Sequence, residues 1–229
     1  MCGRYFLSEV VEGINDTLEV LHSPDLRTGA NLAPTESVSG LTLNAGKLEL
    51  RKFRWGLIPS WSRRDPARER PLINARIETV GEKPSFKESF YQRRTVLPAS
   101  GFIEWRGQER GRKVPYRVEP SSGEIVGLAG IWDSWRSPRG EVIHSVAVLT
   151  REASSDFQAI HHRLPVMLRQ GDWKAYLSGK LSSAADVLQA ATLVATLDVA
   201  PIGTGINRPG RQDAELLKSS KPAKTLKAS

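Results

Sequence analysis

The chain has 229 residues, 39% of them hydrophobic and 25% charged, which is ordinary for a globular protein able to bury a substantial core. Its formal net charge of +8 favours a polyanionic partner such as nucleic acid, although a protein can be basic without one. The single cysteine excludes an internal disulfide framework and a cysteine-rich zinc site, and the sequence predicts neither a membrane span nor a signal peptide.

The predicted elements of the first half begin with a helix over 9–21, where apolar residues recur at helical spacing after Ser8. A turn-rich loop is expected over 23–40. A hairpin follows over 41–55, with its turn around Asn44-Ala45-Gly46, and then a long proline-containing loop over 56–72. Ser85 and Glu88 form a capping-box pattern, which predicts a short helix over 85–94.

The second half is predicted to consist mainly of strands. β-Branched and aromatic residues indicate strands over 95–105, 115–120, 124–135, 142–150 and 192–200, and short helices are expected over 154–160, 171–179 and 183–192. Strands and helices do not alternate regularly, which favours an α+β fold. The lysine-rich segment 218–229 has little to bury and is predicted to be a disordered basic tail.

Cys2 stands directly after the initiator methionine, and its side chain is small enough to allow removal of Met1, which makes Cys2 the N-terminus. Residue 2 would then carry an α-amine and a thiol whose reference pKa values, about 7.7–8.0 and about 8.5, leave both partly nucleophilic at neutral pH. Such a 1,2-aminothiol condenses with an aldehyde to an imine and then closes to a five-membered thiazolidine. The alternative is a small apolar residue that fills space under the first strand.

Two arginine-rich segments contain interleaved tryptophans. Trp55 and Trp61 lie within the basic segment 51–70, and Trp105 lies within the segment 104–113. Arginine with exposed indole is typical of a groove for single-stranded nucleic acid, where cations contact phosphates and indoles stack on bases. These tryptophans could instead belong to the core and the arginines to a solvated surface, which is the simpler interpretation for Trp55.

Several polar residues lie within apolar runs. Asn74, Arg76 and Glu78 alternate with apolar residues, and Glu104 follows residues expected to be buried. A buried carboxyl has a raised pKa and can act as an acid near neutral pH, although an ion pair with a nearby arginine is as good an explanation. His161 and His162 adjoin Arg163, but their spacing matches no metal site, so no metal or other cofactor is predicted.

Seven short blocks in order resemble one known family, the SRAP family of SOS response-associated peptidases and abasic site processing proteins. The blocks are CGRY at 2–5, NLAPTE at 31–36, WGLIPSW at 55–61, NARIET at 74–79, GFIEW at 101–105, LT at 149–150 and IHHRLP at 160–165. The segment 203–217 resembles the end of that family's domain. The resemblance implies a single SRAP-like α+β domain over 1–217, with central curved mixed or antiparallel β-structure, peripheral short helices and a basic cleft.

The resemblance also implies an activity. Proteins of this family bind abasic sites in single-stranded DNA and link their N-terminal cysteine to the sugar aldehyde as a thiazolidine, which protects the lesion during the DNA damage response. By this resemblance Cys2 is the nucleophile and Asn74 orients it. Glu104 is the acid or base that opens the sugar ring, and His161 assists proton transfer. The residues implied in DNA contact are Gly3, Arg4, Pro34, Trp61, Arg76, Trp105, Thr150 and Arg163.

Two alternatives remain open at the sequence level. One is a cysteine peptidase or amidase that uses Cys2 with His161 and Glu104, in line with the family's peptidase label and with removal of its own leader residue. The other is a non-catalytic module that only binds single-stranded DNA. On any of these interpretations we expect a monomer in the cytoplasm without membrane contact, and association with the nucleoid if the protein is bacterial.

Overall fold

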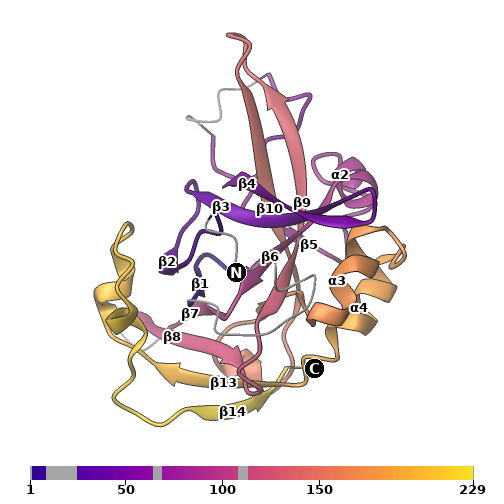
Figure 1. Cartoon of the computed structure of the whole chain (residues 1–229). Coiled ribbons are helices and arrows are strands. Elements are labelled where there is room, and N and C mark those ends of the chain that lie inside the picture. The colour runs from indigo at the N-terminus through magenta and orange to yellow at the C-terminus, as the bar shows by residue number, and fades with distance from the viewer. Residues whose placement is uncertain (1, 9–24, 64–68, 108–112, 229) are drawn as a thin grey trace.

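The computed structural model describes residues 2–8, 25–63, 69–107 and 113–228 (Figure 1). The helix predicted over 9–21 falls outside these described residues. A six-stranded sheet runs along one side, in the order β14-β13-β8-β7-β1-β2, and every pairing within it is antiparallel. Its strands are β1 (Tyr5–Leu7), β2 (Gly29–Leu32), β7 (Gly101–Gly107), β8 (Lys113–Pro120), β13 (Thr196–Pro201) and β14 (Lys224–Lys227).

The second sheet closes on itself. Strand β10 pairs with β4 and also with β9, so that β10, β4, β3, β6 and β9 form a ring, while β5, β11 and β12 are attached at its margins. Closure satisfies the backbone groups that an open sheet leaves at its edges. The strands are β3 (Ser37–Asn44), β4 (Lys47–Trp55), β5 (Asn74–Arg76), β6 (Arg94–Ala99), β9 (Val126–Arg136), β10 (Val142–Glu152), β11 (Arg163–Pro165) and β12 (Met167–Leu168).

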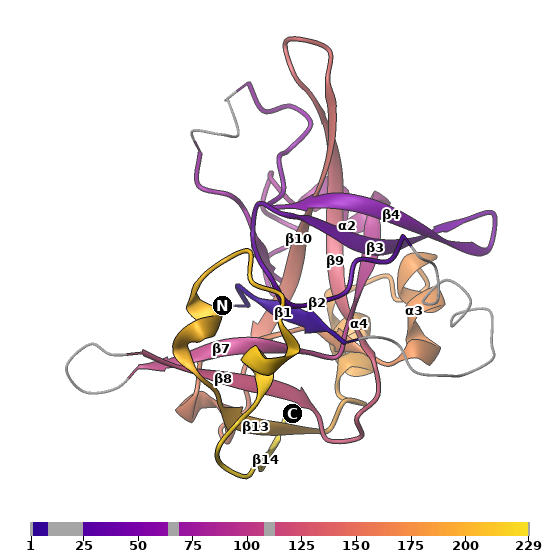
Figure 2. The same cartoon turned by 60° about the vertical axis from the view of Figure 1, so that its left-hand side comes forward.

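The helices are short and peripheral. α3 packs against β6 and β9, and α4 packs against β12, so both cover one side of the closed sheet, as Figure 2 shows from a second direction. The α+β class with curved central β-structure and peripheral short helices is therefore confirmed. The helices are α2 (Lys87–Gln92), α3 (Gln170–Leu177) and α4 (Ala184–Ala191), with 3-10 turns η2 (Phe157–Ala159), η3 (Thr204–Asn207) and η4 (Ala214–Leu217).

The first four residues of β7 are buried on both faces of the six-stranded sheet, and this determines where their side chains lie. Phe102 belongs to the main core between the two sheets, whereas Ile103 belongs to a smaller cluster beneath η3 and η4. Because side chains alternate along a strand, Glu104 shares the inner face with Phe102, and Trp105 shares the outer face with Ile103. Phe157 of η2 covers the inner face, with its ring centroid 6.1 Å from that of Phe102.

Local sequence signals succeeded where the turn chemistry is strong. The predicted hairpin is β3–β4, and its two turn residues, Ala45 and Gly46, have φ values of 47° and 80°, as a tight two-residue hairpin turn requires. The prediction of a loop over 23–40 is wrong, because β2 and the start of β3 lie in this segment. The capping box at Ser85 is also wrong: α2 begins at Lys87 without a side-chain cap. Residues 85–86 are instead part of the preceding turns.

The C-terminal segment differs from the predicted disordered tail. Residues 224–227 form β14, which pairs with β13 in the register Leu226↔Leu197. Leu226 and Ala228 are buried, and the Arg151 guanidinium donates to the Ala228 carbonyl at 2.5 Å. The segment is ordered because its one large apolar side chain reaches the main core and its backbone completes the edge of the sheet, a long-range gain that its lysine-rich composition conceals.

Candidate active site

Cys2 lies where the N-terminal strand enters the space between the two sheets. It is completely buried, and the Asn74 side-chain amide donates to its carbonyl oxygen at 2.9 Å. Asn74 starts β5, which pairs with β10 of the closed sheet, whereas β1 belongs to the six-stranded sheet. Asn74 therefore fixes the backbone of Cys2 across the boundary between the sheets. Burial, with the Glu104 charge adding to it, raises the pKa of the Cys2 thiol to about 12.

Glu104 lies on the inner face of β7 and is 4% exposed. Its Oε1 accepts from the Trp105 backbone N–H at 3.3 Å, and burial raises the pKa of the carboxyl above its ordinary value. The His161 Nε2 atom lies 4.0 Å from the same Oε1. Burial lowers the pKa of His161 to about 4, so the imidazole is neutral at pH 7. The contact is thus one between a carboxyl and a neutral imidazole.

The hydrogen bonds of His161 define which of its nitrogens faces Glu104. The Arg163 backbone N–H is 3.0 Å from Nδ1 and can only donate, while the Arg163 carbonyl lies farther away at 3.3 Å. Nδ1 therefore accepts, and the proton of the neutral ring is on Nε2, directed toward Glu104. His162 stacks on His161 at 4.3 Å between centroids and is exposed, so His161 is the histidine that faces the carboxyl.

The structure thus brings together the four residues predicted as catalytic. Cys2 is hydrogen-bonded to Asn74, Glu104 contacts His161, and the Glu104 charge acts on the Cys2 thiol. The Asn74 Oδ1 atom is buried and has no hydrogen-bond partner among the described residues. It is therefore an acceptor available to a hydroxyl or amine that enters the site.

The predicted DNA-contact residues fall into exposed and buried groups. Trp61 is 62% exposed and Arg76 is exposed, whereas Gly3, Pro34 and Trp105 are partly buried. Thr150 and Arg163 are buried, and they contact each other: the Arg163 guanidinium donates to the Thr150 carbonyl at 2.7 Å.

The sequence did not indicate that Glu78 pairs with Arg163. The Arg163 guanidinium donates to both carboxylate oxygens of Glu78, at 2.9 and 2.8 Å. The two residues are far apart in the sequence and meet only because β11 lies beside the end of β10, so no local spacing predicts the pair.

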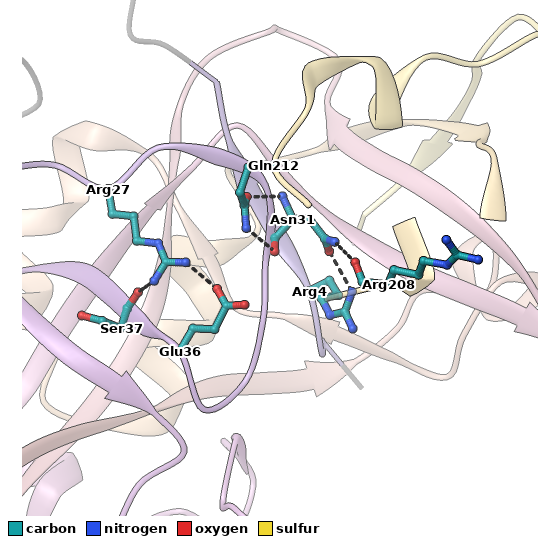
Figure 3. A network of polar contacts seen from close by, with 7 residues as sticks. All are labelled: Arg4, Arg27, Asn31, Glu36, Ser37, Arg208 and Gln212. Carbon is teal, nitrogen blue, oxygen red and sulfur yellow. Dashed lines mark hydrogen bonds and ion pairs between the residues drawn. The ribbon is translucent and has the colours of Figure 1, made fainter. Parts of the chain in front are cut away.

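Arg4 is held by a polar network on the outer face of the six-stranded sheet (Figure 3). Its guanidinium donates to Asn31 Oδ1 at 2.7 Å and to the Ile206 carbonyl at 2.9 Å. Asn31 exchanges two backbone hydrogen bonds with the Gln212 side chain and donates to the Arg208 carbonyl. Sequence reasoning missed Asn31 and Gln212, although Asn31 lies within one of the quoted blocks.

Trp105 lies beside this network. The Arg4 guanidinium carbon is 5.8 Å from the centroid of the Trp105 ring, and the indole N–H donates to Asn207 Oδ1 at 2.8 Å. Arg4 and Trp105 therefore lie on the outer face of the six-stranded sheet, opposite to the face that carries Glu104. That Arg4 and Trp105 contact DNA stays a prediction.

Neither a metal centre nor a membrane helix is found in the part of the chain that the structure describes. No group of three or more histidine, cysteine or acidic side chains in these residues is arranged to hold a metal ion. No helix among them is long and apolar enough to span a bilayer.

Comparison with known proteins places this chain in one family. The family model described as "SOS response associated peptidase (SRAP)" matches residues 1–209. The chain is 30% identical to abasic site processing protein YoaM of Bacillus subtilis over 95% of this chain and 97% of the relative. It is 28% identical to abasic site processing protein YoqW of the same organism, over 96% and 100%.

A solved structure of a Bacteroides thetaiotaomicron protein has the same fold. It superposes with a TM-score of 0.73 at 25% identity and covers 86% of this chain and 88% of that one. Fold and site together define a small α+β protein with one closed sheet and a buried cysteine beside an asparagine, a carboxyl and a neutral imidazole. The chain belongs to the SRAP family.

Proposed function

We propose that this protein processes abasic sites in single-stranded DNA by linking Cys2 covalently to the sugar aldehyde. The observation that carries the proposal is the position of Cys2, whose carbonyl is fixed by Asn74 beside the Glu104–His161 pair. The names of the bacterial relatives supply the substrate class. The proposal requires that Met1 is removed, because only an N-terminal cysteine carries a free amine next to its thiol.

The raised thiol pKa favours an order of steps in which the amine reacts first. At neutral pH the thiol stays protonated, whereas a free α-amine with a pKa near 7.7–8.0 is partly neutral. The amine adds to the aldehyde carbon, and loss of one water molecule gives the imine. The thiol sulfur then adds to the imine carbon while its proton passes to the nitrogen, which closes the thiazolidine. Water is the only molecule released, and no oxidant or reductant is needed.

The pKa shifts of Glu104 and His161 suit the proton transfers in this sequence of steps. The open aldehyde forms from a cyclic hemiacetal, so one group must protonate the ring oxygen as another removes the hydroxyl proton. Because burial raises its pKa, the Glu104 carboxyl holds its proton to a higher pH than a free glutamate, which suits a group that donates a proton and takes it back. The neutral His161 ring presents Nε2–H as a hydrogen-bond donor to a sugar oxygen.

Contact with the strand is assigned to the exposed members of the predicted set. Trp61 and Arg76 are accessible to a base and a phosphate, respectively. A DNA-associated location in the cytoplasm and a monomeric state belong to the same proposal. Since phosphate contacts dominate, affinity for undamaged strand should fall as salt rises.

The experiment uses protein shown by intact mass to lack Met1 and an oligonucleotide with a single abasic site. A heat-stable adduct is expected with the natural abasic sugar, and its mass should equal that of protein plus DNA minus one water molecule. A tetrahydrofuran analogue, which has no aldehyde, should bind without forming an adduct. Cys2→Ala, or two residues added ahead of Cys2, should abolish the adduct and leave binding. A persistent adduct with Cys2→Ala would exclude the proposal.

The peptidase interpretation has one observation in its favour, namely that a histidine and a carboxyl lie near a cysteine. A cysteine peptidase needs a thiolate, however, and burial disfavours that state at Cys2. Incubation of the Met-free protein with a panel of peptides and separation of the products tests this directly. Cys2-dependent turnover would support a peptidase.

A further inference from the structure

A basic cavity of about 730 Å³ lies beneath the C-terminal segment, outside the site described above. Its floor is formed by side chains of β8, β13 and β14, and its lining includes Ile160, the residue before His161. The cavity is also lined by Arg106, Val114, Tyr116, Lys218, Lys221 and Lys224.

The strand register places this cavity next to Glu104. On β7 and β8, Glu104 pairs with Tyr116 and Arg106 pairs with Val114. Opposed residues of antiparallel strands, and residues two apart on one strand, share a face of the sheet. One face of the sheet therefore carries Glu104, Arg106, Val114 and Tyr116. The cavity begins at Tyr116, which lies directly opposite Glu104 on the neighbouring strand.

The charge of the cavity is strongly positive. Arg106, Lys218, Lys221 and Lys224 line it together with one acidic residue, Asp156. Lys218 is paired with an exposed glutamate at 2.7 Å, but no ion pair joins the other three cations to an acidic side chain of the described residues. Three unneutralised cations above a partly apolar floor suit a ligand with several negative charges and a flat ring.

The backbone that carries Lys221 and Lys224 is held in place. The Ser219 hydroxyl donates to the Pro201 carbonyl at 2.6 Å and accepts from the Lys221 backbone N–H at 3.1 Å. Lys224 starts β14 and pairs with Val199. The segment that carries these lysines extends beyond residue 209, the end of the match to the family model.

We propose that this cavity binds phosphodiester groups of the single strand on one side of the abasic sugar, with Tyr116 available to stack on a base. The inference rests on the proposed function, which places the sugar at Glu104. On this proposal the DNA leaves the sugar past Tyr116 and Arg106, the two cavity residues that the strand register places near Glu104. The C-terminal segment is then a binding element for one flank of the lesion.

The test compares Lys221→Ala/Lys224→Ala with a matched control, Lys174→Ala/Lys180→Ala, which removes two exposed lysines at and after α3. Equilibrium binding to an intact single-stranded oligonucleotide is measured from 0.05 to 0.5 M salt. The first variant should lose about tenfold in affinity at 0.1 M salt, and its salt slope should become shallower by about 1.4, the value for two lost phosphate contacts. The control should match wild type.

Lys221→Ala alone, which leaves β14 intact, should give about half of this change in slope. Adduct formation is then followed with two abasic oligonucleotides, one extended only 5′ of the lesion and the other only 3′. Lysine removal should raise the concentration needed for half-maximal rate with one of them and leave the other unchanged, with the same maximal rate for both.

The inference is overturned if both double variants bind alike, or if both half-substrates respond equally. Because binding to intact strand needs no chemistry, loss of affinity in the first variant without any adduct in wild type would support the cavity and exclude the crosslinking function. Normal adduct formation without any effect of the lysine substitutions would support the crosslinking function and exclude a role of the cavity in DNA binding.

Discussion

At the scale of single residues, burial makes the largest contribution to the pKa shifts of the site. It raises the pKa of Glu104 and Cys2 and lowers that of His161, so the pKa of each group is shifted in the direction that favours its neutral form. A site with neutral groups can exchange protons with a sugar without the strong hydration that charged groups carry. This arrangement should reduce the stability of the fold, since each buried group resists ionisation.

Glu104→Gln should separate activity from stability. Loss of the proton-transfer group should slow adduct formation by about 10²–10⁴-fold. The free energy of unfolding at pH 7 should rise, because the folded state no longer holds a carboxyl whose ionised form is disfavoured by burial. The gain should shrink at pH 4.5, where the unfolded chain also retains the proton.

Quenched adduct kinetics and urea unfolding at the two pH values measure both effects, with the exposed Glu82→Gln as the control. Unchanged stability at pH 7 would mean that the site solvates the carboxylate after all.

Two arginines of the predicted DNA surface should respond in opposite ways. Arg163 is buried and paired with Glu78 and Thr150, so Arg163→Ala should lower the free energy of unfolding by about 2 kcal/mol. Arg76 is exposed, so Arg76→Ala should change stability by less than about 0.5 kcal/mol. The latter should instead weaken strand binding, with a salt slope shallower by about 0.7. Thermal melts and salt-dependent binding check the pair, and reversed behaviour would contradict the assignment.

At the scale of elements, local signals predicted what local chemistry determines. The β3–β4 hairpin was predictable from Asn44-Ala45-Gly46, and the end of α3 from Gly179, which has φ 77°. The candidate catalytic residues were predictable because they lie in short blocks of sequence. Closure of the second sheet and the Glu78–Arg163 pair were not, because each joins segments that only the folded topology brings together.

β14 provides the test at this scale. Leu226 is its one large side chain in the core, so Leu226→Ala should lower the free energy of unfolding by about 2 kcal/mol. Lys227→Ala, at an exposed neighbouring position, should stay within about 0.5 kcal/mol of wild type. Urea unfolding measures both. Equal stability of the two variants would mean that the segment is only loosely associated, as its composition alone predicts.

At the scale of the whole molecule, the site lies where the two sheets meet. Cys2 enters from the strand of one sheet, Asn74 comes from the other, and Glu104 lies on the inner face between them. Titration of the site residues is therefore coupled to the stability of the entire fold rather than to a surface loop.

The stability of the molecule should accordingly pass through a maximum between about pH 6.5 and 8.5. Below about pH 6.5 the unfolded chain binds a proton at His161 before the folded chain does, because the folded pKa is about 4, so stability falls as pH falls. Above about pH 8.5 the unfolded chain loses the Cys2 proton, which the folded chain keeps to about pH 12, so stability falls as pH rises. The raised pKa of buried Tyr5 extends this loss above about pH 10.

Chemical denaturation in steps from pH 5 to 10 measures the profile, and three variants assign its limbs. His161→Gln should flatten the acid limb, and Cys2→Ala should remove the loss of stability between about pH 8.5 and 10. Glu104 acts against His161, since its raised pKa favours the folded state as pH falls, so Glu104→Gln should make the acid limb steeper. A flat profile in wild type, or limbs unaffected by these substitutions, would show that the buried groups are solvated in the folded protein and that the site is more open than its geometry indicates.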